Sequence, residues 1–204
     1  MAENVPVEHP AERTFWRWVE EYVSQPHPAI GRDGSVCPFV PRLVEEGNLF
    51  VEIDDTLDGS DAGAMEARMR RAVGDYLAMP DAYWKSLVIV FPNVVGDDVE
   101  VVDRVQGALK PDCVPKGLMV GQFHPLSTEP AARNPQFPAN RAPVAAIALR
   151  HMSYHDIVFL DRSEEMFREF DARFGDEYRG GRDLDPFLVE RYEVAAARFG
   201  TNGG

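Results

Sequence analysis

The segment KSLVIVF at residues 85–91 most constrains the fold, because its β-branched and aromatic residues are typical of a buried β-strand. Three further strands are predicted at residues 48–54 (NLFVEID), 117–123 (GLMVGQF) and 144–150 (VAAIALR). Helical periodicity separates the first three strands, at residues 61–79 and 97–109. The order βαβαββ predicts an α+β fold in which helices cover one face of a mixed sheet, close to a ferredoxin-like sandwich.

Helices are also predicted on both sides of this core. Residues 10–24 repeat apolar side chains at three- and four-residue intervals, and Gln25-Pro26-His27-Pro28 ends that helix. Two C-terminal helices are expected, one around residues 163–174 with Ser163 as its N-cap and one at 186–199. We therefore predict a single domain over residues 1–204, with an N-terminal helix (1–30), an α+β core (31–160) and C-terminal helices (161–204).

Charge and cysteine content exclude several classes of function. The chain has 21 basic and 34 acidic residues, and a formal net charge of −13 disfavours binding to nucleic acids and anionic membranes. Its N-terminus lacks a basic region followed by an apolar run, and no segment resembles a membrane span of roughly 20 apolar residues. We expect a cytoplasmic protein in which Cys37 and Cys113 are reduced.

The segment between residues 123 and 144 is long for a loop inside a compact domain, and such loops are usually functional or disordered. Its prolines favour order, because they restrict the backbone, and they stand at positions 125, 130, 135, 138 and 143. Phe137 and Leu126 are predicted to anchor the loop to the core. The loop is therefore interpreted as a device that positions side chains.

Cationic and imidazole side chains gather in this loop and at the ends of its flanking strands: His124, Arg133, Asn134, Arg141, Arg150 and His151. A guanidinium group can bind both oxygens of a carboxylate, so the set predicts a small anionic ligand. The alternative is that these arginines pair with the abundant acidic side chains. We assign no role to His9 or His27. His155 fits a residue of a helix N-terminal turn as well as it fits a functional group.

Cys37 precedes a proline, which suits a thiolate presented to a soft metal or haem iron. A buried small hydrophobic residue beside Phe39 explains the same cysteine equally well. Cys113 is interpreted as structural. The acidic run DDTLDGSDAG at residues 54–63 is interpreted as a solvated turn and helix N-cap, because its spacing matches no calcium-binding loop.

Several motifs together suggest a family: VCPFVP at residues 36–41, then QFHP, RNP and NRAPV, ending in LRHM. They resemble a bacterial domain-of-unknown-function family, number 6875, and more distantly a second uncharacterised family with CPF, FHP and NRSP motifs. The resemblance spans roughly Arg32 to Leu160. It implies a shared set of residues: Cys37, Pro38, Phe39, His124, Pro125, Arg141, Pro143 and Arg150. It also implies that Arg32, Arg133, Asn134 and His151 are particular to the nearer family. Ala142 replaces the serine of the distant motif, which excludes a serine nucleophile there.

Three classes of function remain open. In the first, Cys37, His124 or His151 binds haem iron or another metal, Arg32, Arg133 and Asn134 help to hold the cofactor, and Arg141 and Arg150 act at the substrate. Trp16, Trp18 and the methionines are available to enclose a cofactor. In the second, His124 activates Cys37 for hydrolysis or acyl transfer, with Glu129 or Asp156 as candidates to orient the imidazole. In the third, the arginines bind an anionic metabolite without catalysis.

The first class is our prediction: a haem-dependent redox tailoring enzyme for a small, anionic, amino-acid-like substrate in specialised bacterial metabolism. Such an enzyme implies an electron donor as partner, and a homo-oligomer is compatible with the sequence. P-loop, dinucleotide-binding, zincin and EF-hand motifs are all absent from the sequence.

Overall fold

Strand β2 (Ser86–Phe91) is buried along its whole length and lies inside a four-stranded sheet. It pairs in parallel with β1 (Leu49–Ile53) and antiparallel with β6 (Ala145–His151), and β3 (Leu118–Phe123) follows β6 in the order β1-β2-β6-β3. The computed structural model describes residues 9–80, 84–181 and 183–200. The α+β class and the mixed sheet are confirmed, whereas the ferredoxin-like topology stays a prediction.

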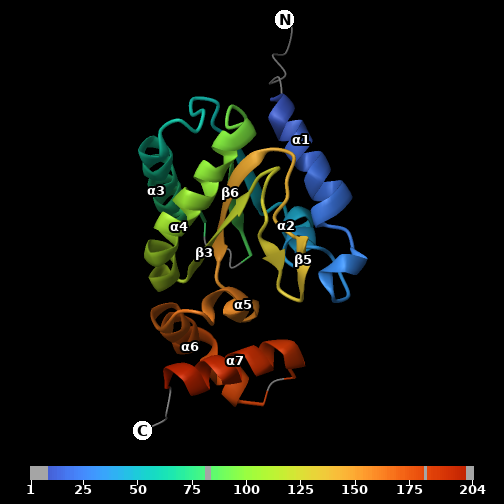
Figure 1. Cartoon of the computed structure of the whole chain (residues 1–204), viewed down its shortest axis with the longest axis vertical. Coiled ribbons are helices and arrows are strands. Elements are labelled where there is room, and N and C mark those ends of the chain that lie inside the picture. The colour runs from blue at the N-terminus through green and yellow to red at the C-terminus, as the bar shows by residue number, and fades with distance from the viewer. Residues whose placement is uncertain (1–8, 81–83, 182, 201–204) are drawn as a thin grey trace, which may run out of the picture. The chain divides into compact units, whose positions relative to one another are not determined.

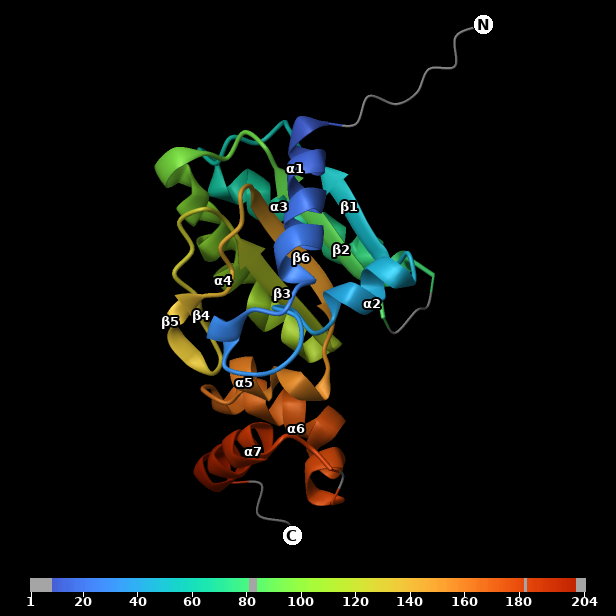
Figure 2. The same ribbon diagram turned by 90° about the vertical axis from the view of Figure 1, so that its right-hand side faces the viewer.

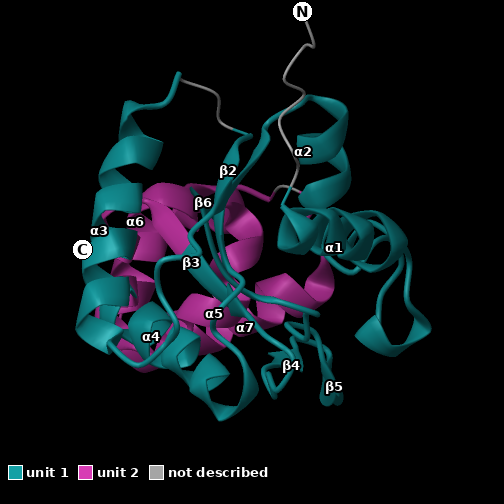
Figure 3. Ribbon diagram, turned by 90° about the horizontal axis from the view of Figure 1, so that it is seen from above, with its two compact units in different colours: residues 1–109, 120–150 teal, residues 110–119, 151–204 magenta. Residues whose placement is uncertain are grey.

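Helices cover both faces of the sheet rather than the one face that the sequence predicted (Figures 1 and 3). On one face lie α3 (Ala62–Ala78) and α4 (Val101–Cys113), the latter preceded by the 3-10 helix η3 (Gly96–Glu100). The apolar side chains of α3 that face the sheet, Met65, Met69, Ala72, Val73 and Tyr76, are buried, whereas Leu77 is 48% exposed.

The opposite face carries α1 (Pro10–Trp18) and α2 (Val40–Glu45), and α1 crosses in front of the sheet in Figure 2. Phe15, Val19 and Leu43 pack there against alternate strand residues such as Val88 and Val90. A five-residue π-helix, η1 (Val19–Val23), continues α1, and the 3-10 helix η2 (Pro28–Ile30) follows it.

The predicted long loop contains a two-stranded hairpin, β4 (Pro130–Ala131) and β5 (Asn134–Pro138). Phe137 packs against the half-buried rings of His27 and Tyr22, with ring centroids 4.6 and 6.5 Å away. Leu126 is 49% exposed, so the prediction that it anchors the loop is wrong.

The chain forms two compact units, residues 1–109 with 120–150 and residues 110–119 with 151–204 (Figure 3). The second unit contains η4 (Val114–Lys116), η5 (Tyr154–Asp156), α5 (Ile157–Leu160), α6 (Glu164–Arg179) and α7 (Pro186–Phe199). Its core is built around Ile157, Phe167, Phe170 and Tyr192. Ser163 takes the N-cap position of α6, as predicted, but its side chain makes no capping hydrogen bond.

Candidate functional site

The predicted loop begins where the edge strand β3 ends. His124 follows Phe123 directly and forms a parallel β-bridge with Arg141 at the other end of the loop. The carbonyl oxygen of His124 accepts hydrogen bonds from the amides of Ser127 and Ala142, each at 3.2 Å. The backbone therefore brings His124 and Arg141 together, as the sequence motifs suggested.

The imidazole of His124 is held from the α4 side of the sheet. Its side chain is 1% exposed, and Nε2 lies 3.0 Å from Oδ2 of Asp103 in α4. Asp103 therefore orients the ring, and the prediction that Glu129 or Asp156 does so is wrong. Asp156 instead caps η5 by accepting a hydrogen bond from the Ser153 amide.

The second nitrogen of this ring has no hydrogen-bond partner among the described residues, although Nδ1 is fully buried. If Nε2–H donates to the Asp103 carboxylate, the neutral ring keeps a lone pair on Nδ1. Leaving such a buried polar atom without a partner costs about 1–3 kcal/mol, so it requires an explanation in the function or in a bound molecule. The arrangement suits a proton acceptor or a metal ligand.

Cys37 lies on the other side of the sheet. It is half-buried and packs against the apolar cluster beneath α1, which contains Phe15, Phe39 and Leu43. Phe123 belongs to the same cluster, with its ring 5.6 Å from Trp18. Because successive strand side chains point to opposite faces, the ring of His124 points away from this cluster. The structure therefore does not bring Cys37 and His124 together.

The guanidinium group of Arg141 is exposed and is oriented by one hydrogen bond, from Nε to the carbonyl oxygen of Ser127 at 3.3 Å. Its backbone oxygen accepts the indole N–H of Trp18 at 3.1 Å. Its positive charge also acts on Tyr22. Of the predicted arginines, Arg141 is the one best placed to bind an external anion.

Two other predicted arginines are held by the protein itself. The guanidinium carbon of Arg150 lies 4.3 Å from the centre of the Phe39 ring. Arg32 donates to the carbonyl oxygens of Asp33 and Val36, at 2.8 and 3.0 Å. These contacts give both residues a structural role next to the Cys37 segment.

Arg133 and Asn134 fix the hairpin to the turn at η2. The side-chain amide of Asn134 donates to the carbonyl oxygen of Ala29 at 2.8 Å. Gly31 has a φ of +75°, and a Cβ atom there would lie 3.0 Å from Cβ of Arg133. The positive φ and the close approach of Arg133 together explain why residue 31 is a glycine.

His151 is the last residue of β6 and belongs to the second compact unit. Within residues 9–80, 84–181 and 183–200, no group of three or more His, Cys, Asp and Glu side chains could together hold a metal ion. Met65, Met69, Met119 and Met152, offered as cofactor contacts, are buried core residues.

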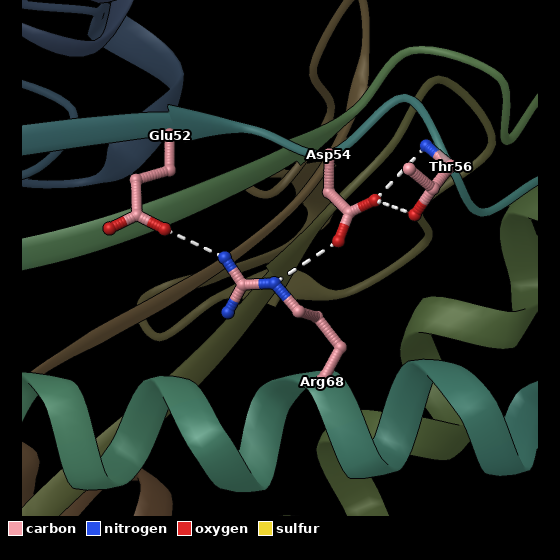
Figure 4. A network of polar contacts seen from close by, with 4 residues as sticks. All are labelled: Glu52, Asp54, Thr56 and Arg68. Carbon is pink, nitrogen blue, oxygen red and sulfur yellow. Dashed lines mark hydrogen bonds and ion pairs between the residues drawn. The ribbon is translucent and has the colours of Figure 1, made fainter.

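The acidic run forms the predicted turn and N-cap. Asp61 accepts the amide of Ala64 at the start of α3, and Asp54 accepts hydrogen bonds from the amide and hydroxyl of Thr56. Arg68 of α3 joins Asp54 and Glu52, at 3.1 and 2.7 Å (Figure 4). These carboxylates thus make hydrogen bonds and ion pairs within the protein.

Fold and site together define a small α+β protein in which the buried His124, at the start of a proline-rich loop, pairs with the partly exposed Asp103. The chain belongs to the family described as Domain of unknown function (DUF6875), which matches residues 12–184. No curated protein and no solved structure matches it. None of the helices in the described part of the chain is long and apolar enough to cross a membrane.

Asp103 is the main site residue that sequence reasoning missed. It lies within the predicted helix at 97–109, where acidic side chains are ordinary. A spacing of 21 residues from His124 corresponds to no local pattern. The available signal was its position between apolar residues, since Val102 and Val105 are buried on either side of it.

Proposed function

We propose that the protein is a haem-dependent redox enzyme that modifies a small, anionic, amino-acid-like substrate in specialised bacterial metabolism. His124 supplies the iron ligand through Nδ1, and Asp103 positions the imidazole. The observation that carries this proposal is the buried ring of His124, which has a carboxylate 3.0 Å from Nε2 and no described partner at Nδ1.

A carboxylate on the outer nitrogen is the usual companion of a metal-binding histidine, because it fixes the tautomer and raises the basicity of the ligating nitrogen. Haem suits a single protein ligand, since the porphyrin provides four nitrogens itself. Because Nδ1 is buried, the cofactor reaches it only when the segment that follows His124 moves. Arg141 then binds the anionic group of the substrate, and an external electron donor in the cytoplasm completes the reaction.

The cysteine-dependent alternative has less support, because Cys37 and the Asp103–His124 pair belong to opposite faces of the sheet. Anion binding without catalysis is favoured by one observation, the exposed guanidinium group of Arg141.

A haemin titration followed by visible absorption tests the proposal. We expect the wild type to develop a Soret band that His124→Ala and His124→Gln both lose while their far-UV circular dichroism is retained. Asp103→Asn should keep the band but bind haemin about 10–100-fold more weakly, the usual cost of removing such a carboxylate.

His9→Asn is the matched control, because it removes another histidine of the same unit and keeps a residue that can cap α1. Cys37→Ala should leave the band unchanged. A band that survives in both His124 variants, or a wild type that gives no band, contradicts the proposal. Loss in Cys37→Ala alone would transfer the ligand role to the thiolate.

A further inference from the structure

Four rings lie next to one another where α1 ends and the hairpin returns: Trp18, Tyr22, His27 and Phe137. We call them the aromatic row. Trp18 and Tyr22 are stacked with centroids 6.3 Å apart, Phe137 lies 6.5 Å from Tyr22, and His27 stacks on Phe137 at 4.6 Å. All four are half-buried, so each ring keeps part of its surface open to solvent.

Local structure fixes these rings. The π-helix η1, which continues α1, carries Tyr22. His27 accepts the amide of Ala29 at Nδ1, which sets the orientation of its ring. The hydrogen bond from Asn134 to Ala29 then holds the hairpin, and with it Phe137, against the same turn.

A cationic group lies beside the row. Arg141 is joined to Trp18 through the indole hydrogen bond, and its charge acts on Tyr22. No described residue accepts a hydrogen bond from its two terminal nitrogens, and no described carboxylate pairs with it. By contrast, Arg68 and Arg191 each bind carboxylates of the chain. The net charge of the protein is −13, so an exposed guanidinium group without a described carboxylate partner is unusual. Its two terminal nitrogens are suited to bind an external anion.

Tyr22 offers a second donor. Its hydroxyl group has no hydrogen-bond partner in the described ranges. Burial raises its pKa, and the charge of Arg141 opposes that change only in part. The hydroxyl group is therefore protonated at neutral pH and can donate to an anion.

We infer that Arg141, Tyr22 and the aromatic row form a binding site for a carboxylate carried on a planar ring. The carboxylate accepts hydrogen bonds from the terminal nitrogens of Arg141 and from the Tyr22 hydroxyl group, while its ring packs on the row. This inference deepens the proposed function by naming the class of substrate, and only the role of the ligand as substrate rests on that function. Binding itself requires neither iron nor His124.

The test is calorimetric titration of the full chain with three probes: benzoate, its uncharged analogue benzamide, and acetate, which has the carboxylate but no ring. We expect benzoate to bind at millimolar concentration or better and the other two about tenfold more weakly or worse. On binding, the indole N–H resonance of Trp18, assigned with Trp18→Phe, should shift. Equal binding of benzamide or of acetate overturns the inference, and so does a failure of benzoate to bind.

Variants locate the site. Arg141→Gln should weaken benzoate about tenfold, and Tyr22→Phe, which removes only the hydroxyl group, about fivefold. The matched control is Arg71→Gln, which removes one exposed positive charge from α3 on the other face of the sheet and should leave the affinity unchanged. Unchanged affinity in Arg141→Gln contradicts the site. His124→Ala should still bind benzoate even where it loses haem, so the two proposals fail separately.

Discussion

Lys85 is a buried lysine that the structure uses as a hydrogen-bond donor. It is 5% exposed, and Nζ donates to the carbonyl oxygens of Met79 and Pro80 just after α3, at 3.0 and 3.1 Å. The ammonium group also lies 5.0 Å from the centre of the Tyr76 ring. No carboxylate in the described part of the chain pairs with it, so carbonyl oxygens and a ring face provide its polar contacts.

Replacing Lys85 with methionine tests this role. The substitution keeps the apolar stem but leaves two carbonyl oxygens without their donor, so we expect a loss of about 2 kcal/mol in the free energy of unfolding. Urea unfolding measures it. Lys116→Met is the control, because Lys116 also donates to one carbonyl oxygen but is exposed, and its loss should stay within about 0.5 kcal/mol. Equal losses in the two variants would contradict the role given to burial.

Asp54 makes stability depend on pH. Burial alone would raise its pKa, but hydrogen bonds from Thr56 and the charge of Arg68 outweigh burial and lower it (Figure 4). A carboxyl group whose pKa is lower in the folded state stabilises the protein above its unfolded pKa of about 3.9, and that contribution disappears as pH falls through the folded value.

Asp54→Asn should therefore be less stable than the wild type at neutral pH, and the difference should shrink at about pH 3. Urea unfolding of both proteins at the two pH values measures the change. Thr56→Val, which removes the hydroxyl donor, should weaken the same pH dependence. A difference that grows on acidification would show that the pKa of Asp54 is raised instead.

Among the elements, those with a clear hydrophobic period were predicted closely, whereas α2 and the hairpin of β4 and β5 were not. The bounds predicted for β2 and α7 differ from the structure by one residue at most. By contrast, α2 was not among the predicted helices, and Pro41 lies in its first turn, where no amide donor is required. The hairpin was predicted as a loop because prolines are typical of loops, yet its strands contain Pro130, Pro135 and Pro138.

For the candidate site, the sequence indicates where residues lie along the chain but not which face of the sheet their side chains occupy. Strand ends are visible in a sequence, so His124 was placed at the start of the loop and Arg141 near its return, and the structure joins their backbones in one bridge. The face on which a side chain lies depends on the pleat at the strand end and on which helix covers that face. Neither of these two factors can be read from neighbouring residues in the sequence. For this reason Cys37 was grouped with His124, and Asp103 was missed.

The hairpin gives a prediction at the scale of the element. Asn134→Ala removes the hydrogen bond that ties β5 to η2 and the one that Oδ1 accepts from the Gln136 amide, so amide hydrogens of residues 130–138 should exchange about five- to tenfold faster. Hydrogen exchange measures this effect. Gln136→Ala is the control, because Gln136 is exposed and uses only its backbone amide in a described hydrogen bond. Unchanged exchange in Asn134→Ala would mean that other contacts hold the hairpin.

At the scale of the whole molecule, the two compact units are joined by continuous elements. The unit boundaries at residues 109/110, 119/120 and 150/151 fall inside α4, β3 and β6. A boundary inside a helix or strand means that neither unit can lose its structure without disturbing the hydrogen-bond ladder of an element shared with the other. The predicted single domain therefore requires that both units unfold in one transition.

Two core isoleucines allow a matched test, because Ile147 of the first unit and Ile157 of the second are both 0% exposed. Each Ile→Val change should lower stability by about 1 kcal/mol. The three tryptophans lie in the first unit and report on it by fluorescence, whereas the buried thiol of Cys113 reports on the second by its reactivity. If the chain is one cooperative domain, either substitution shifts both urea midpoints by the same amount. A shift confined to one reporter would show that the units unfold separately.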